Sequence, residues 1–593
     1  MKIKVNRNIL WTNTFVEALV HAGVKHACIS PGSRSTPLTY ALAFNRKIKS
    51  HVIVDERSSG FFALGLAKEV QKPVILVCTS GTAVAELYPA IIEAYQSKVP
   101  LIVCTADRPQ EARMMGANQT INQKNIFKNH IRWFMNAGLP QTSESGLKKI
   151  INIAQRAVIE SSHHRLGPVH INFPFKEPFE PAYFTDQIEI GLIKSAKSKL
   201  KLSPSSNDAG RKVSEKILAD ISEKIYHHSR GIIVVGVDNY TKGFFSALSK
   251  LSQKIDFPIF ADAASNMRFA FSENQNVLTN YDSYLRSEIF VKNHQPDFII
   301  QFGRNLTSKA LSNFISNNRC EKLLVNQFGE WKNPKDKSTA AIAADPEKLC
   351  KDLTLTLKRN KSVRNKWAND FLSIEKSASK IKTKLFGQAQ FPNETRIVHE
   401  VIHSIPDDSN LMVSNSLPIR DLDLVVPIMK KNIKVFHNRG ASGIDGITST
   451  ALGIAQSSMQ RTYLLTGDLA FYYDLNSLQT AKKYNIPLTI ILINNNGGRI
   501  FEVLPISNYK NIFEEYFTAP HNLDFSKLVR AFGGNYREVK SWKVFKELLS
   551  AESTGRMFSV IELKTDPIKS LSLRRKYYDK VIADCNNNSK TLL

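Results

Sequence analysis

The stretch TIILINNNGG, residues 489–498, decides the fold class of this chain. Its four consecutive aliphatic residues, Ile490–Ile493, are typical of a short strand buried on both faces of a parallel sheet. The run then stops at three asparagines and two glycines. Because open α/β sheets bind ligands at the carboxyl ends of their strands, this polar break is a candidate binding site.

A second strand-like run, TYLLTGD, precedes it, with a helical segment between the two. Parallel neighbouring strands would bring Asp468 and Asn495 to one sheet edge although they lie 27 residues apart. A carboxylate, a carboxamide oxygen and the backbone carbonyl at Gly497 are hard ligands that suit Mg²⁺ and leave room for diphosphate oxygens. Gly467 and Gly497 would let the backbone approach the phosphates. Each half alone is a common turn former. The two motifs together, each at the end of an apolar strand, favour a binding site for a metal ion and a diphosphate.

Strands and helices alternate along most of the 593 residues, which are too many for a single core. The fold class predicted is α/β, with three consecutive doubly wound domains and mainly parallel sheets. We expect domains at 1–184, 213–384 and 385–593, with a Lys/Ser/Pro-rich linker at 185–212. The outer blocks are candidates for distant copies of one fold.

Composition excludes several classes of protein. Hydrophobic residues make up 42% and charged residues 22%, as in soluble globular proteins. No apolar run approaches the ~20 residues that span a bilayer, so we expect a cytoplasmic protein without stable membrane insertion. Six cysteines without a CxxC pair favour reduced, buried thiols over disulfides or zinc.

The net charge of +27 raises the question of a nucleic-acid partner. The densest basic stretches, 194–212, 358–367 and 573–580, resemble linkers and a tail, and none carries an RNA-recognition or zinc-finger signature. A lysine-rich solvated surface, with no nucleic-acid partner, is the favoured interpretation.

The order strand, Gly-Asp, helix, strand, Asn-Asn resembles the thiamine-diphosphate enzymes, although Leu469 stands where the wider family has glycine. The resemblance implies thiamine diphosphate and Mg²⁺, with Mn²⁺ as an alternative. In HVIVDERSSG, residues 51–60, Glu56 lies between a strand and a helix. A glutamate there is ordinarily stabilised by the helix dipole. In this family its position is that of the carboxylate that drives proton movement in the cofactor's aminopyrimidine.

Longer motifs narrow the resemblance to the menaquinone-pathway synthases that join 2-oxoglutarate to isochorismate. They are SPGSRSTPLTYA (30–41), TSGTAVAELYPAIIEA (79–94), TADRPQEARMMGANQTINQ (105–123), NSLPIRDLD (415–423), HNRGASGIDGITSTALGIA (437–455) and NNNGGRIFEVLP (494–505). The resemblance implies decarboxylation of 2-oxoglutarate and conjugate addition of the succinyl carbanion equivalent to isochorismate, giving 2-succinyl-5-enolpyruvyl-6-hydroxy-3-cyclohexene-1-carboxylate.

The resemblance also implies the site residues. Both substrates are dicarboxylates, which guanidinium groups grip bidentately. Substrate contacts are expected at Ser33, Arg34, Arg108, Gln119, Lys309, Ser416, Arg420 and Arg439, and Ala310 stands where some relatives carry a second basic residue. Cofactor contacts are expected at Glu56, Ser416, Ile444, Gly467, Asp468, Leu469, Asn495, Gly497, Ile500 and Phe501, with Asp468, Asn495 and Gly497 on the metal. The catalytic residues expected are Glu56, Arg34, Arg439 and Ser416.

Because Glu56 and Asp468 fall in different blocks, the resemblance implies a homodimer or homotetramer in which the two blocks come from different chains. Three alternatives stay open on the sequence. They are another thiamine-diphosphate-dependent 2-oxoacid lyase or decarboxylase, a basic nucleic-acid-binding protein, and a noncatalytic paralogue. Intact Glu56, Asp468 and Asn495 argue against the last of these.

Overall fold

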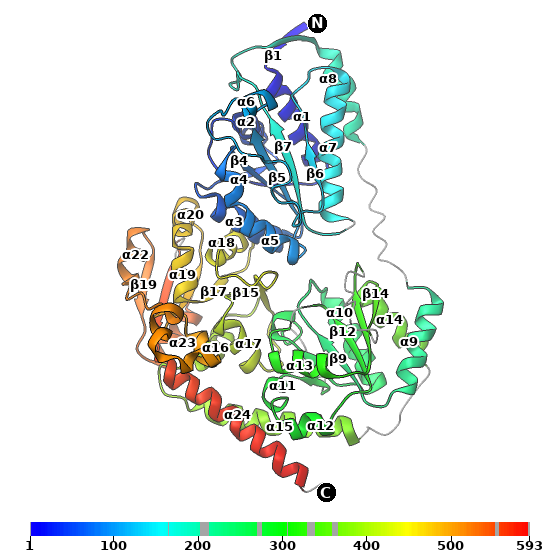
Figure 1. Ribbon diagram of the computed structural model, residues 1–593, viewed down its shortest axis with the longest axis vertical. Coiled ribbons are helices and arrows are strands. Elements are labelled where there is room, and N and C mark those ends of the chain that lie inside the picture. Colours follow the sequence, from blue (N-terminus) through cyan, green and yellow to red (C-terminus); the bar gives the residue numbers. More distant parts are fainter. Residues whose placement is uncertain are drawn as a thin grey trace. The chain divides into compact units, whose positions relative to one another are not determined.

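The computed structural model describes residues 2–163, 165–201, 213–269, 275–304, 306–328, 339–357, 366–551 and 557–590 (Figure 1). They contain three six-stranded sheets whose paired strands are all parallel, which confirms the predicted α/β class. The chain divides into two compact units. The first comprises Met1–Asn207, Asn438–Met459 and Phe471–Leu488, and the second comprises Asp208–His437, Gln460–Ala470 and Thr489–Leu593.

The first sheet has the strand order β3-β2-β4-β5-β7-β6. Its strands are β2 (His26–Ile29), β3 (Lys49–Val52), β4 (Val74–Cys78), β5 (Leu101–Asp107), β6 (Phe134–Asn136) and β7 (Pro168–Pro174). The helices of this block are α1 (Arg7–His21), α2 (Thr36–Phe44), α3 (Glu56–Val70), α4 (Thr82–Glu86), α5 (Tyr88–Gln96), α6 (Gln110–Met114) and α7 (Glu144–Ser162). Helix α1 packs on α2 and α7, whereas α3 packs on α5. The central strands β4, β5 and β7 are buried throughout, as their apolar sequences predict.

The expected linker at 185–212 is partly a structured extension of the first domain. Strand β8 (Asp186–Glu189) pairs antiparallel with β1 (Lys2–Val5), and α8 (Ile190–Lys197) packs on α7 before the short helix η1 (Ser198–Lys201). Ile188, Ala196 and Leu200 are buried there, so a few apolar residues anchor a segment whose lysines suggested a solvated linker. Residues 202–212 lie outside the described residues.

The central sheet has the order β11-β10-β9-β12-β13-β14, the order of dinucleotide-binding folds. Its strands are β9 (Gly231–Val235), β10 (Ile259–Ala261), β11 (Val277–Leu278), β12 (Phe298–Phe302), β13 (Glu321–Asn326) and β14 (Thr339–Ala343). The helices are α9 (Glu215–His227), α10 (Lys242–Ile255), η2 (Ala263–Ser265), α11 (Tyr281–Tyr284), α12 (Glu288–Asn293), α13 (Lys309–Asn317), α14 (Pro346–Thr356) and α15 (Lys366–Gly387). Helix α15 crosses the domain boundary that we expected at residue 384.

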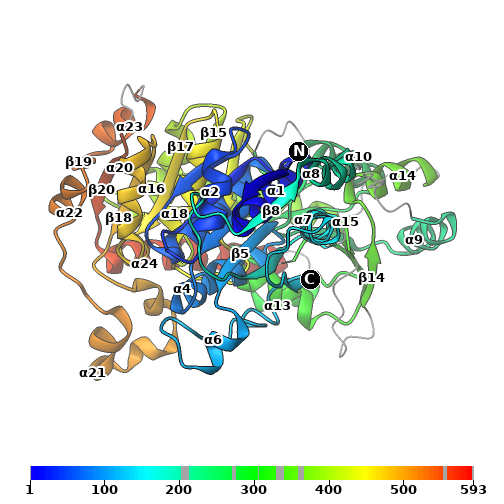
Figure 2. The same ribbon diagram turned by 90° about the horizontal axis from the view of Figure 1, so that it is seen from above.

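The third sheet has the order β16-β15-β17-β18-β20-β19. Strands β15, β17, β18, β20 and β19 of this sheet are labelled in Figure 2. Its strands are β15 (Ser409–Val413), β16 (Ile433–His437), β17 (Thr462–Gly467), β18 (Thr489–Asn494), β19 (Asn535–Glu538) and β20 (Ser559–Lys564). Numbered along the chain, the first and third sheets share the order 2-1-3-4-6-5. This supports the idea that the outer blocks are copies of one fold. In such an order the topological switch lies beside the first strand, here between β15 and β17.

The remaining helices connect or follow these strands. They are α16 (Glu394–Ser404), α17 (Leu417–Val425), α18 (Ile447–Ser457), α19 (Asp468–Tyr473), η3 (Leu475–Ser477), α20 (Leu478–Tyr484), η4 (Arg499–Val503), η5 (Pro505–Asn508), α21 (Lys510–Phe513), η6 (Glu514–Thr518), α22 (Phe525–Ala531), α23 (Trp542–Ser550) and α24 (Pro567–Lys590). The basic stretch 573–580, which resembled a tail, lies inside α24, and α24 packs along α15. Arg574 and Tyr577 are buried in it, because one face of this helix covers the core.

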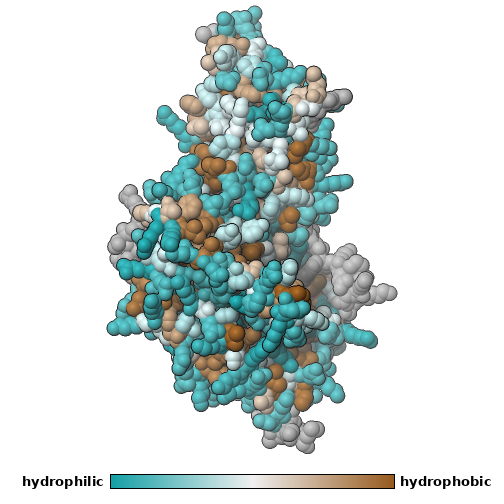
Figure 3. Space-filling model, turned by 60° about the vertical axis from the view of Figure 1, so that its left-hand side comes forward, coloured by the Kyte–Doolittle hydropathy of each residue, from teal (hydrophilic) through white to brown (hydrophobic). Residues whose placement is uncertain are grey.

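The state of the cysteines agrees with the expectation of reduced, buried thiols. All six cysteines are free, and five of them are buried. Among the described residues no helix is long and apolar enough to cross a membrane. On the face drawn in Figure 3, hydrophobic side chains form scattered patches among hydrophilic ones.

Candidate active site

Two predicted arginines lie together at the carboxyl edge of the first sheet. Arg34 follows β2 and donates from Nη1 to the carbonyl of Phe175, 2.9 Å away, just beyond β7. Arg108 follows β5 and donates from Nη1 to Ser80 Oγ at 2.6 Å and to the Gln119 carbonyl at 2.8 Å. Burial lowers the pKa of Arg34 below its ordinary value, and the positive charge of Arg108 lowers it further, whereas the Glu177 and Asp107 carboxylates oppose part of this shift. The two cations are therefore close enough to repel, which favours an anionic ligand beside them.

The turns that carry these residues are packed closely. A Cβ atom on Gly32, in the turn before Arg34, would lie 2.4 Å from Thr79 Cβ, so the turns after β2 and β4 are in direct contact. Ser33 is exposed in the turn after β2, and Gln119 is exposed in the segment that follows β5 and α6. Gln119 has a left-handed backbone, with φ of 53°. The structure thus brings Ser33, Arg34, Arg108 and Gln119 to one edge, as the motifs predicted.

Glu56 is the first residue of α3, and Asp55 caps the helix by accepting from the Ser58 amide. The Glu56 side chain is half-buried. Burial raises its pKa above the ordinary value, and the neighbouring Asp55 and Glu86 carboxylates raise it further. A carboxyl group with a raised pKa holds or releases a proton more readily near neutral pH, as a proton-transfer role requires.

The start of α3 is tied to the turn after α19 in the same unit. Arg57 Nη2 donates to the Tyr473 carbonyl at 3.1 Å, and Ser58 Oγ lies 3.4 Å from Asp474 Oδ1. Asp474 also accepts from the amide and hydroxyl of Ser449, at 2.6 and 2.8 Å. Burial raises the pKa of Asp474 to about 6. Asp474 was not predicted as a site residue, and its one signal in the sequence is a lone carboxylate in the largely apolar stretch LAFYYDLNSL.

The glycine-rich loop 437–446 is fixed against α3 and α5. Glu93 accepts from the amides of Gly440 and Ala441 at 3.0 and 2.7 Å. A Cβ atom on Gly446, which has φ of +63°, would overlap the Phe61 ring at 1.9 Å, so only glycine fits there.

This rigid loop positions the predicted residues Arg439 and Ile444. Arg439 is buried with 9% of its surface exposed, and Ile444 is half-buried.

In the second unit, Asp468 and the Asn-Gly turn meet at the edge of the third sheet, as predicted. Strands β17 and β18 are paired, with Gly467 opposite Ile493. Asp468 is 2% exposed, and its two oxygens accept from the amides of Leu469 and Gly497 at 2.7 and 3.0 Å. His521 Nε2 lies 3.2 Å from Asp468 Oδ2, a neighbour that the sequence did not indicate.

The Asn-Gly turn is shaped by close backbone contacts. Gly497 has φ of +136°, and a Cβ atom on it would lie 2.2 Å from the Thr518 carbonyl. Asn495 donates from Nδ2 to Glu394 at 2.9 Å, which leaves its oxygen on the other side of the amide. Among the described residues, no atom other than those of its two chain neighbours lies within 4 Å of a Cβ built on Gly467, so the backbone just before the buried Asp468 has open space beside it. A buried carboxylate, an amide oxygen and open space fit a hydrated Mg²⁺ and a diphosphate.

The other predicted residues of this unit lie around strand ends. Ser416 follows β15, across the switch point from Asp468, and has φ of 73° and ψ of −132°. Such backbone strain in a residue other than glycine is typical of functional sites. Arg420, on the exposed side of α17, donates to the Ser416 carbonyl at 2.6 Å. Leu469, Ile500 and Phe501 are half-buried, and Phe501 packs on Phe517.

Lys309 is exposed at the first position of α13, in the central domain, with half-buried Ala310 beside it. No contact of Lys309 among the described residues supports its expected role in substrate binding.

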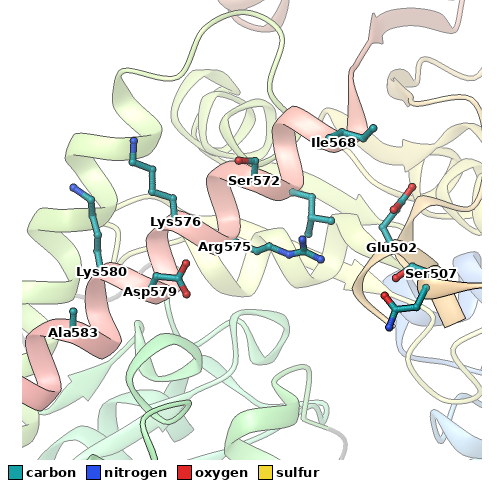
Figure 4. A pocket seen from close by; sticks show the side chains of 11 residues that line it. Glu502, Ser507, Ile568, Ser572, Arg575, Lys576, Asp579, Lys580 and Ala583 are labelled. Carbon is teal, nitrogen blue, oxygen red and sulfur yellow. The ribbon is translucent and has the colours of Figure 1, made fainter. Parts of the chain in front are cut away.

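A separate cavity of about 690 Å³ lies between α24 and the η4–η5 segment (Figure 4). Figure 4 shows Arg575 extending from α24 toward the side that carries Glu502 and Ser507. The cavity is lined by no predicted site residue, although Glu502 follows Ile500 and Phe501 in the same short helix. It is therefore not the predicted cofactor seat.

Three family models of known proteins match three successive parts of the chain. The family model "Thiamine pyrophosphate enzyme, N-terminal TPP binding domain" matches residues 11–126, "Middle domain of thiamine pyrophosphate" matches 209–413, and "Thiamine pyrophosphate enzyme, C-terminal TPP binding domain" matches 429–563. A solved structure of the Rhodococcus jostii RHA1 thiamine diphosphate-dependent 4-hydroxybenzoylformate decarboxylase has a TM-score of 0.67 and covers 94% of this chain and 99% of its own. At 13% identity it supports the fold alone.

Relatives named 2-succinyl-5-enolpyruvyl-6-hydroxy-3-cyclohexene-1-carboxylate synthase match along nearly the whole chain. The Bacillus velezensis protein is 36% identical, over 98% of this chain and 99% of its own. The Geobacillus kaustophilus protein is 36% identical over 97% and 99%, and the Myxococcus xanthus protein 34% identical over 98% and 99%. The chain therefore belongs to the 2-succinyl-5-enolpyruvyl-6-hydroxy-3-cyclohexene-1-carboxylate synthase family of thiamine pyrophosphate enzymes.

Proposed function

We propose that this protein is a thiamine-diphosphate-dependent transferase of menaquinone biosynthesis. In the proposed reaction 2-oxoglutarate loses carbon dioxide, and the remaining succinyl unit is added in conjugate fashion to isochorismate. The observation that carries the proposal is the match to the synthases along 98% of the chain, in which Glu56, Asp468 and Asn495 are all present. Another thiamine-diphosphate lyase is not favoured, because the relatives share one name across diverse organisms.

The carboxyl edge of the third sheet would hold the charged end of the cofactor. Asp468, Asn495 and the Gly497 carbonyl supply hard oxygens for Mg²⁺, with Mn²⁺ as an alternative. Half-buried Leu469, Ile500 and Phe501 would line the cofactor pocket, and Ile444 would press on the cofactor from the glycine-rich loop. When bound, thiamine diphosphate supplies the carbanion chemistry that decarboxylation requires.

Glu56 would exchange a proton with the pyrimidine ring of the cofactor. Its raised pKa, caused first by burial, keeps part of the carboxyl population protonated closer to neutral pH than an ordinary glutamate. Helix α3 and its Asp55 cap hold the group in place. The carboxyl group is therefore positioned for general acid–base work.

The arginines would bind the substrate carboxylates. The bonds of Arg34 and Arg108 described above go to neutral acceptors, and the carboxylates of Glu177 and Asp107 offset only part of the repulsion at Arg34, whose pKa stays lowered. A dicarboxylate would relieve their mutual repulsion and offer bidentate partners. We assign further carboxylate or hydroxyl contacts to Ser33, Gln119, Lys309, Ser416, Arg420 and Arg439, with Ser416 and Arg439 nearest the reacting atoms.

We further propose a cytoplasmic homodimer or homotetramer without a nucleic-acid partner, in which Glu56 of one chain faces the cofactor held by Asp468 of another. Light scattering of the purified protein, with and without cofactor, measures the assembly.

The function is tested with purified protein, thiamine diphosphate and Mg²⁺. Carbon dioxide release from 2-oxoglutarate is measured with and without isochorismate, and the product is identified by mass. Pyruvate is the matched control substrate, because it has the same 2-oxoacid group but lacks the second carboxylate. We expect turnover of 2-oxoglutarate and formation of the adduct only with isochorismate. Preferred turnover of pyruvate, or no adduct, would reject the proposal.

A further inference from the structure

A buried ion network joins three elements of the second unit. Arg574 of α24 donates from Nε and Nη2 to the two oxygens of Asp421, on α17, at 2.8 and 2.6 Å. Its Nη2 also donates to Oε2 of Glu394, the first residue of α16, at 2.9 Å. The exposed fractions are 6% for Arg574 and 2% for each carboxylate. Burial alone lowers the pKa of Arg574, but Asp421 and Glu394 raise it above its ordinary value. The guanidinium therefore stays charged.

The second oxygen of Glu394 faces the Asn-Gly turn. Oε1 accepts from Asn495 Nδ2 at 2.9 Å and from Thr565 Oγ1 at 3.1 Å. An ionised carboxylate can only accept hydrogen bonds, so it holds the nitrogen side of the Asn495 amide. The amide oxygen is consequently turned away from Glu394. A flipped amide would set two acceptors, Oδ1 and Oε1, against each other, which is costly at a buried position.

We propose that Glu394, anchored by Arg574, is a positioning residue that fixes the amide oxygen of Asn495 as a metal ligand. The inference rests on the proposed function, because it assigns a partner to the metal seat described above. Outer partners of this kind orient metal ligands, and their loss typically weakens metal binding by about 10 to 100-fold.

A purely structural role is the competing interpretation, since the same network also joins α16, α17 and α24. The two carboxylates of the network separate the alternatives. Glu394→Gln leaves one acceptor oxygen for two donors, Arg574 and Asn495. The charged Arg574 forms the stronger hydrogen bond and therefore keeps this oxygen. Asn495 then faces an NH₂ group and flips, which turns its nitrogen toward the metal. Asp421→Asn weakens the same guanidinium anchor but leaves the Glu394–Asn495 bond in place, so it is the matched control.

The experiment titrates thiamine diphosphate into the wild type and both variants by calorimetry, over a series of Mg²⁺ concentrations. Denaturant unfolding of each protein is measured alongside. We expect Glu394→Gln to weaken the apparent Mg²⁺ affinity at least 10-fold. Asp421→Asn should stay within threefold of the wild type at an equal or larger loss of stability.

Equal Mg²⁺ affinity in Glu394→Gln and the wild type would overturn the inference, and so would an equal loss in Asp421→Asn. If Glu394→Gln does not fold, Glu394→Asp replaces it. This variant keeps the charge but withdraws the acceptor by one methylene, and we expect the same direction of change. A wild type that binds no thiamine diphosphate would instead overturn the proposed function itself, so the two failures are distinguishable.

Discussion

Replacing Glu56 by glutamine separates a catalytic from a structural role for the residue. The substitution keeps the shape of the side chain and removes its titration. A carboxylate at a helix N-terminus contributes about 0.3 to 1 kcal/mol. At Glu56 part of this is cancelled, because burial raises the pKa of the carboxyl group. The Asp55 cap stays in place. We therefore expect the free energy of unfolding to fall by less than about 1 kcal/mol.

The effect on catalysis should be much larger. Loss of a general acid–base group lowers the rate by about 10²- to 10⁴-fold, which corresponds to about 3 to 5 kcal/mol in the activation barrier. The assay measures kcat for carbon dioxide release from 2-oxoglutarate at saturating thiamine diphosphate and Mg²⁺. Cofactor affinity, measured by calorimetry, and denaturant unfolding are followed in parallel. A kcat within threefold of the wild type would refute the assignment.

Glu86→Gln is the matched control. Glu86 is exposed, and its charge raises the pKa of Glu56. Its removal should leave kcat at the optimum nearly unchanged. It should also shift the pH at which Glu56 titrates downward. A shift upward, or none, would show that the pH profile reports another group.

Three further predictions test the site and its support. Gly446→Ala, whose Cβ would meet the Phe61 ring at 1.9 Å, should lower the free energy of unfolding by about 2 to 4 kcal/mol, measured with denaturant, whereas Gly191→Ala, with open space around its Cβ, should not. Arg34→Lys should raise KM for the dicarboxylate substrates about 10-fold or more, with a smaller change in kcat, because lysine cannot bind a carboxylate bidentately. Unchanged steady-state kinetics would show that Arg34 does not bind substrate. Burial lowers the pKa of Lys68 from 10.5 to about 8 in the folded protein. Between these pH values the unfolded chain binds one more proton than the folded protein, so the free energy of unfolding rises with pH, by at most about 3 kcal/mol. Lys68→Met should flatten this rise, measured by denaturant unfolding across the pH range, and an unaltered pH dependence would contradict the prediction.

Local patterns were sufficient to predict the strands and the residues that follow them. The run Ile490–Ile493 ends where its sequence predicted, and Asp468 meets Gly497 because β17 and β18 are parallel neighbours. Arg34 and Arg108 also meet as expected, because their turns follow strands of one sheet with only β4 between them. In each case hydrophobic periodicity and parallel topology determine which polar residues converge.

Long-range pairing could not be read from local composition. The lysine-rich segment that begins at residue 185 forms β8 and α8, because β1 at the start of the chain supplies a partner strand. The basic stretch in α24 resembled a tail, yet Arg574 is buried against carboxylates 153 and 180 residues away in the sequence. Asp474 is similar, since its partners Ser58 and Ser449 are distant in the chain. No local pattern identifies such partners.

The central claim is that the carboxyl edge of the third sheet seats a metal and a diphosphate. Calorimetric titration of thiamine diphosphate into the wild type and Asp468→Asn, with Mg²⁺ and with EDTA, tests it most directly. We predict Mg²⁺-dependent binding to the wild type and at least 10-fold weaker binding to the variant, which is about 1.4 kcal/mol or more. Binding that is equally tight in EDTA, or unchanged by the loss of the Asp468 charge, would contradict the claim.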